Sequence, residues 1–88
     1  MEYTSAHFKR FEGELKKIAA TYALNMNGLR VEFYMPGHQA IFTERIEDEA
    51  YRVHINLEEN RIISIQRVSG NGKPDSEQVR KKYRQYMR

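Results

Sequence analysis

Four strand-like segments joined by very short connections limit what this chain of 88 residues can fold into. Residues 29–35, 39–46, 51–57 and 61–68 show apolar alternation of varying clarity, and only three or four residues separate one segment from the next. A parallel crossover needs about a dozen residues or more, so each connection has to be a hairpin. The spacing therefore predicts a four-stranded antiparallel meander.

The alternation predicts which strand residues face the core. In the first segment, the buried set is Leu29, Val31, Phe33 and Met35. Tyr34 then lies on the wetter face, beside Arg30 and Glu32. In the third segment, the buried set is Tyr51, Val53, Ile55 and Leu57. The last segment places Ile62, Ile63 and Ile65 on both faces, which is typical of a central or doubly covered strand.

The connections contain residues that suit tight turns. Pro36-Gly37 matches the central positions of a type II turn, because proline presets φ and glycine accepts a positive φ. Asn60 can also tolerate a positive φ. Glu44 and residues 47–49 form an acidic cluster, which we interpret as a solvated turn that could also protect a sheet edge. The cluster lacks the glycine and the ligand spacing of an EF-hand calcium loop.

A helix is expected on each side of the meander in sequence. Five apolar residues recur at steps of three and four and predict a helix over residues 5–24: Phe8, Phe11, Leu15, Ile18 and Tyr22. Thr4 or Ser5 can cap its start. Asp75 and Gln78 suit a capping box for a final helix, whose apolar stripe is Val79, Tyr83, Tyr86 and Met87. The expected fold class is α+β, with residues 1–88 forming a single domain in the order α-β-β-β-β-α.

Composition and motifs exclude several classes of function. There is no cysteine, so disulfides and thiolate zinc sites are ruled out, and we expect a cytoplasmic protein. His7, His38 and His54 lack the spacing of metal ligands, although the last two could converge in space. The chain contains no nucleophile elbow, catalytic triad or cofactor motif. We therefore expect a protein that is not an enzyme and needs no cofactor and no metal.

The glycine-bearing segment Ser69–Lys73 leaves two interpretations open. It is not a Walker motif, because Pro74 follows Lys73 and the glycine spacing is wrong. It could hold an anion at the start of the final helix. The favoured interpretation is a plain connection between the last strand and that helix, since Asp75 would occupy the same amide groups.

The final helix concentrates positive charge. Residues 73–88 carry six basic and two acidic side chains, whereas the other 72 residues carry nine basic and ten acidic ones. An acidic membrane surface or a protein partner would suit such a helix, while the absence of a stacking motif argues against nucleic acid. The alternative is a helix face that is simply solvated. The candidate anion-binding or lipid-binding residues are Arg67, Lys73, Arg80, Lys81, Lys82 and Arg84.

The segment Arg67-Val68-Ser69-Gly70, preceded by Ile63 and Ile65, resembles the end of the kinase-associated C-terminal domain of AMPK-related and polarity kinases. That family shares the expected order of elements. The resemblance implies a regulatory module whose basic surface binds acidic phospholipid or restrains a kinase, and it implicates Arg67, Arg80, Lys81 and Lys82.

The order of elements is also similar to the RWD-type domains of kinetochore subunits. In those proteins a helix extended from a coiled coil precedes the meander, and the stripe from Phe8 to Tyr22 would suit that arrangement. This second resemblance implies a protein–protein interaction domain that forms a homo- or heterodimer.

Overall fold

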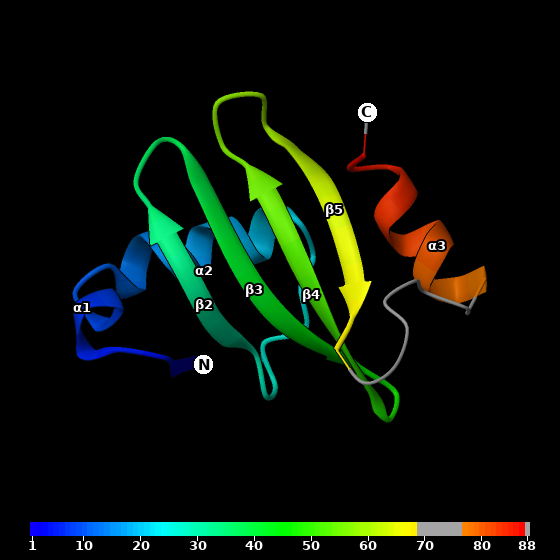
Figure 1. Ribbon diagram of the computed structural model, residues 1–88, viewed down its shortest axis with the longest axis horizontal. Coiled ribbons are helices and arrows are strands. Elements are labelled where there is room, and N and C mark those ends of the chain that lie inside the picture. The colour runs from blue at the N-terminus through cyan, green and yellow to red at the C-terminus, as the bar shows by residue number, and fades with distance from the viewer. Residues whose placement is uncertain (69–76, 88) are drawn as a thin grey trace.

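The computed structural model describes residues 1–68 and 77–87. It has a five-stranded sheet and three helices (Figure 1). The strands are β1 (Glu2–Tyr3), β2 (Arg30–Met35), β3 (Gln39–Ile46), β4 (Glu49–Asn56) and β5 (Arg61–Arg67). The helices are α1 (Ala6–Lys9), α2 (Glu12–Thr21) and α3 (Glu77–Arg84). The predicted α+β class is confirmed.

The sheet has the strand order β1-β2-β3-β4-β5, and β2 to β5 form the predicted antiparallel meander. Gly37 has a φ of 77° and Asn60 a φ of 55°, as their turns require. The difference from the prediction is β1, which pairs with β2 in parallel through Glu2 and Tyr3. Two residues are too few for a periodic pattern, so the sequence carries no signal for this strand.

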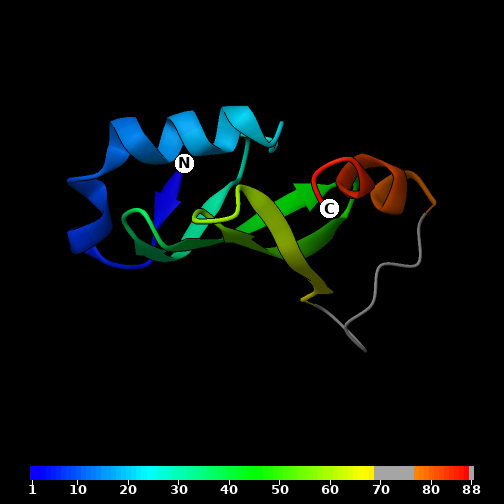
Figure 2. The same cartoon turned by 90° about the horizontal axis from the view of Figure 1, so that it is seen from above.

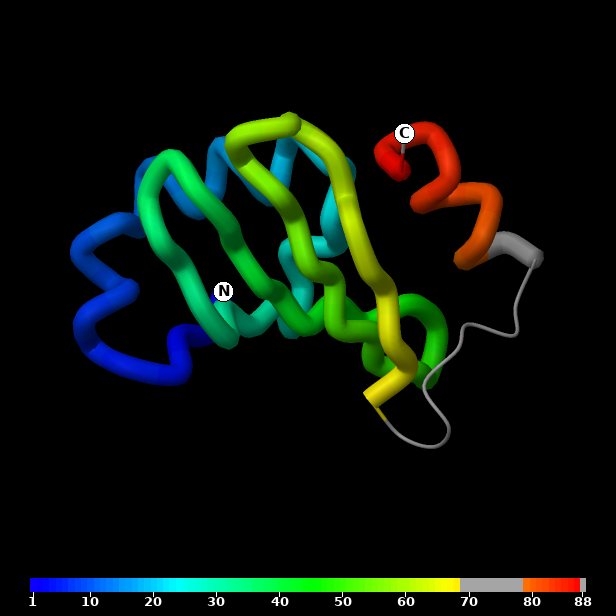
Figure 3. The backbone as a smooth tube through the Cα atoms, turned by 45° about the horizontal axis from the view of Figure 1, so that its top comes forward, coloured from blue at the N-terminus to red at the C-terminus, as the bar shows by residue number. Residues whose placement is uncertain are grey.

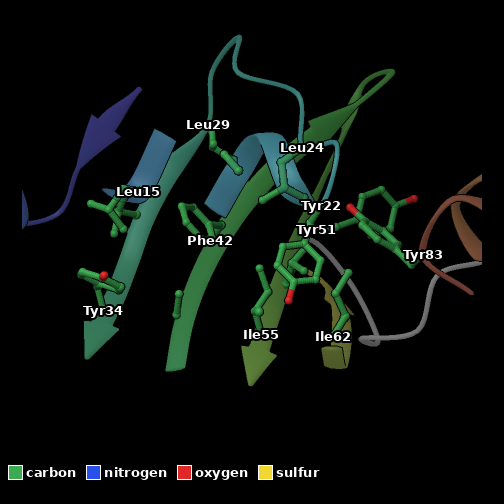
Figure 4. Packing of buried hydrophobic residues seen from close by; sticks show 14 of the residues in the cluster. Leu15, Tyr22, Leu24, Leu29, Tyr34, Phe42, Tyr51, Ile55, Ile62 and Tyr83 are labelled. Atoms are coloured by element: carbon green, nitrogen blue, oxygen red, sulfur yellow. The ribbon is translucent and has the colours of Figure 1, made fainter. Parts of the chain in front are cut away.

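Both α2 and α3 lie on the same side of the sheet, and no described helix covers the other side (Figure 2). The apolar core fills the space between the helices and the sheet (Figure 4). Leu15 and Ala19 of α2 and Tyr83 of α3 are fully buried there against strand residues such as Phe42 and Ile55. Burying these side chains, at roughly 1.5–3 kcal/mol for each large one, is the main driving force for the fold.

The N-terminal helix is shorter and more broken than predicted. Ser5 caps α1 as expected, since its hydroxyl accepts a hydrogen bond from the His7 N–H at 3.0 Å. The Phe11 N–H then bonds to the Phe8 carbonyl, an i−3 bond, before the α-helical pattern resumes with Leu15 bonded to Phe11. The chain turns at this point, so α1 and α2 are separate helices (Figure 3).

The end of α2 is a Schellman motif built on an alanine. Leu24 N–H bonds to the Ala19 carbonyl at 2.9 Å and Ala23 N–H to the Ala20 carbonyl at 3.2 Å, with Ala23 at a φ of 54°. Such a left-handed residue is usually glycine, because a Cβ atom strains this conformation. The sequence predicts a helix that continues to residue 24, whereas α2 ends earlier, at Thr21.

The burial predicted for β2 is wrong in its second half. A bulge between Val31 and Phe33 adds one residue to β2 and reverses the facing of the residues after it. Phe33 and Met35 are therefore exposed, whereas Tyr34 is buried. The Tyr34 ring packs edge-on against Phe11 at 5.3 Å between centroids. One inserted residue is enough to change faces because the side-chain period of a strand is two.

The position predicted for the last strand is also wrong. β5 is the outer strand of the sheet rather than a central one. Its register against β4 shifts between His54 and Ile55, and this bulge explains why Ile62 and Ile63 both look like core residues in the sequence. Only Ile62 is fully buried.

Substituting the left-handed alanine tests the helix end. We expect Ala23→Gly to raise the free energy of unfolding by about 1 kcal/mol, because glycine adopts a positive φ without strain. Ala20→Gly, at an exposed position inside α2, is the matched control and should lower it by about 0.5–1 kcal/mol. Urea unfolding measures the free energy of unfolding of both variants. A loss of stability in Ala23→Gly would contradict a strained conformation at Ala23.

Candidate interaction surfaces

The structure describes five of the six cations predicted as one site, and these five do not all point outward. Lys73 lies outside the described residues. Lys82 forms an ion pair with Glu44, and Arg67 contacts Glu49 at 3.6 Å. Arg80, Lys81 and Arg84 lie on the exposed side of α3. The final helix therefore offers fewer outward cations than its sequence suggests, because one of them points into the fold.

Glu44 is the residue that holds this cation, and it is fully buried. It accepts hydrogen bonds from the Asn25 N–H at 2.6 Å, from the Lys82 ammonium and from the Tyr83 hydroxyl. The interpretation of Glu44 as part of a solvated turn is wrong. The burial of Glu44 could have been predicted from its position in β3, because Ala40, Phe42 and Glu44 occupy alternate positions on the core face.

Two core tyrosines donate to carboxylates. Burial, and then the hydrogen bond to Glu44, raise the pKa of Tyr83 far above its usual range. Burial and the hydrogen bond to Glu14, at 2.6 Å, raise the pKa of Tyr34 to about 12. Both hydroxyls therefore stay protonated at neutral pH and serve as donors that connect the helices to the sheet.

A groove of about 300 Å³ lies between α3 and β5. Its lining is mostly apolar and includes Ile65, Tyr83 and Met87, while Arg80 and Arg84 stand four residues apart along the same helix. An apolar groove bordered by guanidinium groups suits a ligand that has an anionic end and an apolar end.

The larger uncovered surface is the face of the sheet opposite α2 and α3, which we call the open sheet face. It is defined by cross-strand neighbours that share this side of the sheet: Arg30, Phe33, Met35, Ile41, Arg52 and His54. Phe33 is 36% exposed and Met35 is 43% exposed, and both belong to β2. Phe33 pairs with Ile41, which in turn pairs with His54. The open sheet face thus carries an apolar patch, which lies on β2 and the adjoining part of β3.

One end of the open sheet face is rich in arginine. A hollow of about 480 Å³ there is lined by three arginines, Arg30, Arg45 and Arg52, and by two glutamates, Glu2 and Glu32. Arg30 contacts Glu2 at 3.7 Å, and Glu32 accepts a hydrogen bond from Thr43. In the part of the chain that the structure describes, the side chains of Arg45 and Arg52 form no ion pair. We call this hollow the arginine cleft; it was not predicted from the sequence.

The other end of the open sheet face carries the two convergent histidines and the turn that contains Glu58 and Glu59, which we call the acidic turn. His38, His54 and Glu58 line one hollow of about 220 Å³, where His38 Nδ1 lies 3.2 Å from Glu58. His54 Nε2 lies 2.7 Å from the Gln39 side-chain oxygen. Among residues 1–68 and 77–87 no group of three potential ligands has metal-binding geometry. His7 lies apart, beside Phe8 and Phe11.

Comparison with protein-family models, with curated proteins and with solved structures found no match for this chain. The helices in the described ranges are too short or too polar for any of them to cross a bilayer. The features that bear on function are therefore the groove between α3 and β5 and the open sheet face.

The junction at Glu44 can be tested by removing its charge. We expect Glu44→Gln to lower the free energy of unfolding by about 2–4 kcal/mol, because the amide cannot pair with Lys82 and accept from Tyr83 together. Glu47→Gln, an exposed change of the same kind, should stay within about 0.5 kcal/mol. Thermal and urea unfolding at pH 7 measure both, and equal effects would contradict a stabilising role for Glu44.

Proposed function

We propose that this chain is a non-catalytic module that binds a protein partner through the open sheet face. The supporting observation is the exposed pair Phe33 and Met35 on a side of the sheet that no described helix covers. Contiguous exposed apolar side chains with charged residues around them are typical of interaction sites. The arginine cleft and the acidic turn on either side supply such a charged surround.

The bulge in β2 also supports this function. Without it, Phe33 and Met35 would face the core and Tyr34 would face solvent. Bulges re-aim side chains, and this one places two large apolar residues on the solvent side. An uncovered apolar surface costs solubility, so its presence fits a surface that is covered when the partner is bound.

Replacing the exposed methionines one at a time tests the open sheet face. We expect Met35→Ser to abolish capture of a partner from a cell extract that the unaltered chain retains, because it removes exposed apolar area from the open sheet face. Met26→Ser is the matched control, since Met26 is 38% exposed but lies in the loop after α2. Quantitative pull-down of the same partner with each variant measures the effect. Equal retention by both variants would contradict the proposal.

A second candidate function is contact with an acidic phospholipid surface, or with an intramolecular partner, through α3. The observation that favours it is the apolar groove bordered by Arg80 and Arg84, with Lys81 exposed on the same helix. Each basic residue near an acidic bilayer contributes about 1 kcal/mol, so these cations support weak, salt-sensitive binding. The engagement of Lys82 by Glu44 lowers the number that can contribute, which is why this candidate comes second.

Charge reversal on α3 tests the second candidate. We expect Lys81→Glu with Arg84→Glu to remove co-sedimentation with phosphatidylserine vesicles at low salt, since both cations are exposed. Lys9→Glu with Lys17→Glu changes the net charge equally on the N-terminal helices and is the control. Binding that is unaffected by the α3 change, or equal binding to neutral phosphatidylcholine vesicles, would reject a contact through α3.

A further inference from the structure

We propose that the partner of the open sheet face is a second copy of this chain, bound about a two-fold axis that lies perpendicular to the strands. This inference rests on the proposed function and adds the identity and orientation of the partner. It is based on how charge and apolar area are distributed along β4 and its neighbours.

Along β4, the apolar patch lies between the two charged parts of the open sheet face. Arg52 marks the arginine cleft on β4, and Glu58 lies just beyond the other end of the same strand. The point midway between them falls between His54 and Asn56. Those two residues align through the β3 register with Ile41 and Gln39, which pair with Phe33 and Met35. The apolar patch therefore lies at the midpoint.

A two-fold axis through that midpoint, in the plane of contact and perpendicular to the strands, reverses the strand direction of the second copy. It places β4 over β4 and the apolar patch on itself. It also places the arginine cleft of each copy against the acidic turn of the other. Such a self-complementary contact is the requirement of a closed homodimer.

The arginine cleft and the acidic turn carry net charges of opposite sign. The lining of the cleft contains three arginines and two glutamates and is net positive, while Glu47 and Asp48 lie in the turn beyond it. The acidic turn contains Glu58 and Glu59, with Arg61 beside them at 3.2 Å from Glu59, and these three side chains sum to a net negative charge. The side chains of Glu58 and Glu59 are 64% and 51% exposed, so a partner can reach them. Arginine forks bind carboxylates in a bidentate way, which would give Arg45 and Arg52 their partners.

The area of the open sheet face sets the strength of this dimer. Four strands spaced about 4.8 Å apart and about seven residues long cover roughly 440 Å², or about 900 Å² for both copies. Stable interfaces bury about 1,200–2,000 Å², so this contact belongs to the weak, transient class. We expect a dimer that forms at micromolar or higher concentration and dissociates on dilution.

Paired charge reversals test both the partner and its orientation. One variant reverses the cleft with Arg45→Glu and Arg52→Glu, and the other reverses the turn with Glu58→Lys and Glu59→Lys. Sedimentation equilibrium from about 10 µM to about 500 µM should show each variant alone dimerising at least about tenfold more weakly than the unaltered chain. An equimolar mixture should restore dimerisation, because both contacts are complementary only in the mixed pair.

All four reversed side chains are exposed, so the variants are expected to fold, and circular dichroism checks this. If a double variant unfolds, the single changes Arg52→Glu and Glu58→Lys make the same comparison. Failure of the mixture to dimerise better than either variant alone would overturn the proposed orientation. If the unaltered chain stays monomeric over the whole concentration range, pairing with a second copy is ruled out. If Met35→Ser nevertheless loses a captured partner, the proposed function stands, with a protein other than this chain as the partner.

Discussion

The arrangement of the helices depends on the hydrogen bonds that the buried carboxylate of Glu44 accepts. The Glu44 side chain on β3 accepts a hydrogen bond from Asn25 in the loop after α2. It also accepts hydrogen bonds from Lys82 and Tyr83 of α3. A buried charge without partners costs several kcal/mol, so the fold is stable only when both elements are in place. Tyr83 contributes twice, since its ring fills the core while its hydroxyl satisfies Glu44. Glu44 thus ties α3 and the end of α2 to the same side of the sheet.

Placing both helices on one side has a direct consequence for the other. A chain of 88 residues buries only a little over about 60% of its unfolded surface and builds one modest core. The strands therefore separate their residues: one face carries the buried set, such as Phe42, Val53 and Ile55, and the other carries mixed polar and apolar residues. The open sheet face is left over after one core has been completed. Exposed Phe33 and Met35 lie on that face and are not part of the buried core.

The parts of the structure that could be predicted from sequence are those set by local periodicity. β3, β4 and the turn at Gly37 follow from alternation and from backbone preferences that need no tertiary context. The facing of Phe33 could not be predicted, because a bulge inserts one residue without changing the local composition. Glu44 was misread because its acidic neighbours at 47–49 suggested a solvated turn, although its position in the strand pointed inward. The sequence does not distinguish Lys82 from the other cations of α3, because the difference lies in its ion pair with Glu44, which depends on the position of Glu44 in the folded chain.

The edges of the sheet support the proposal that its face, and not its rim, is the surface for association. An uncovered edge strand presents unpaired backbone groups that invite strand-to-strand pairing. At one edge β1 takes up hydrogen bonds of β2, with Glu2 N–H bonded to the Leu29 carbonyl at 2.8 Å. At the other edge the Ile62 N–H of β5 bonds to the carbonyl of Tyr86, just after α3, at 2.7 Å. Because both edges are partly capped, strand-to-strand pairing there is restricted, which favours contact through side chains. On the open sheet face those side chains include Arg45 and Arg52, whose like charges repel partners that cannot neutralise them. In the proposed contact, charge would therefore select the partner while the apolar patch would supply contact area.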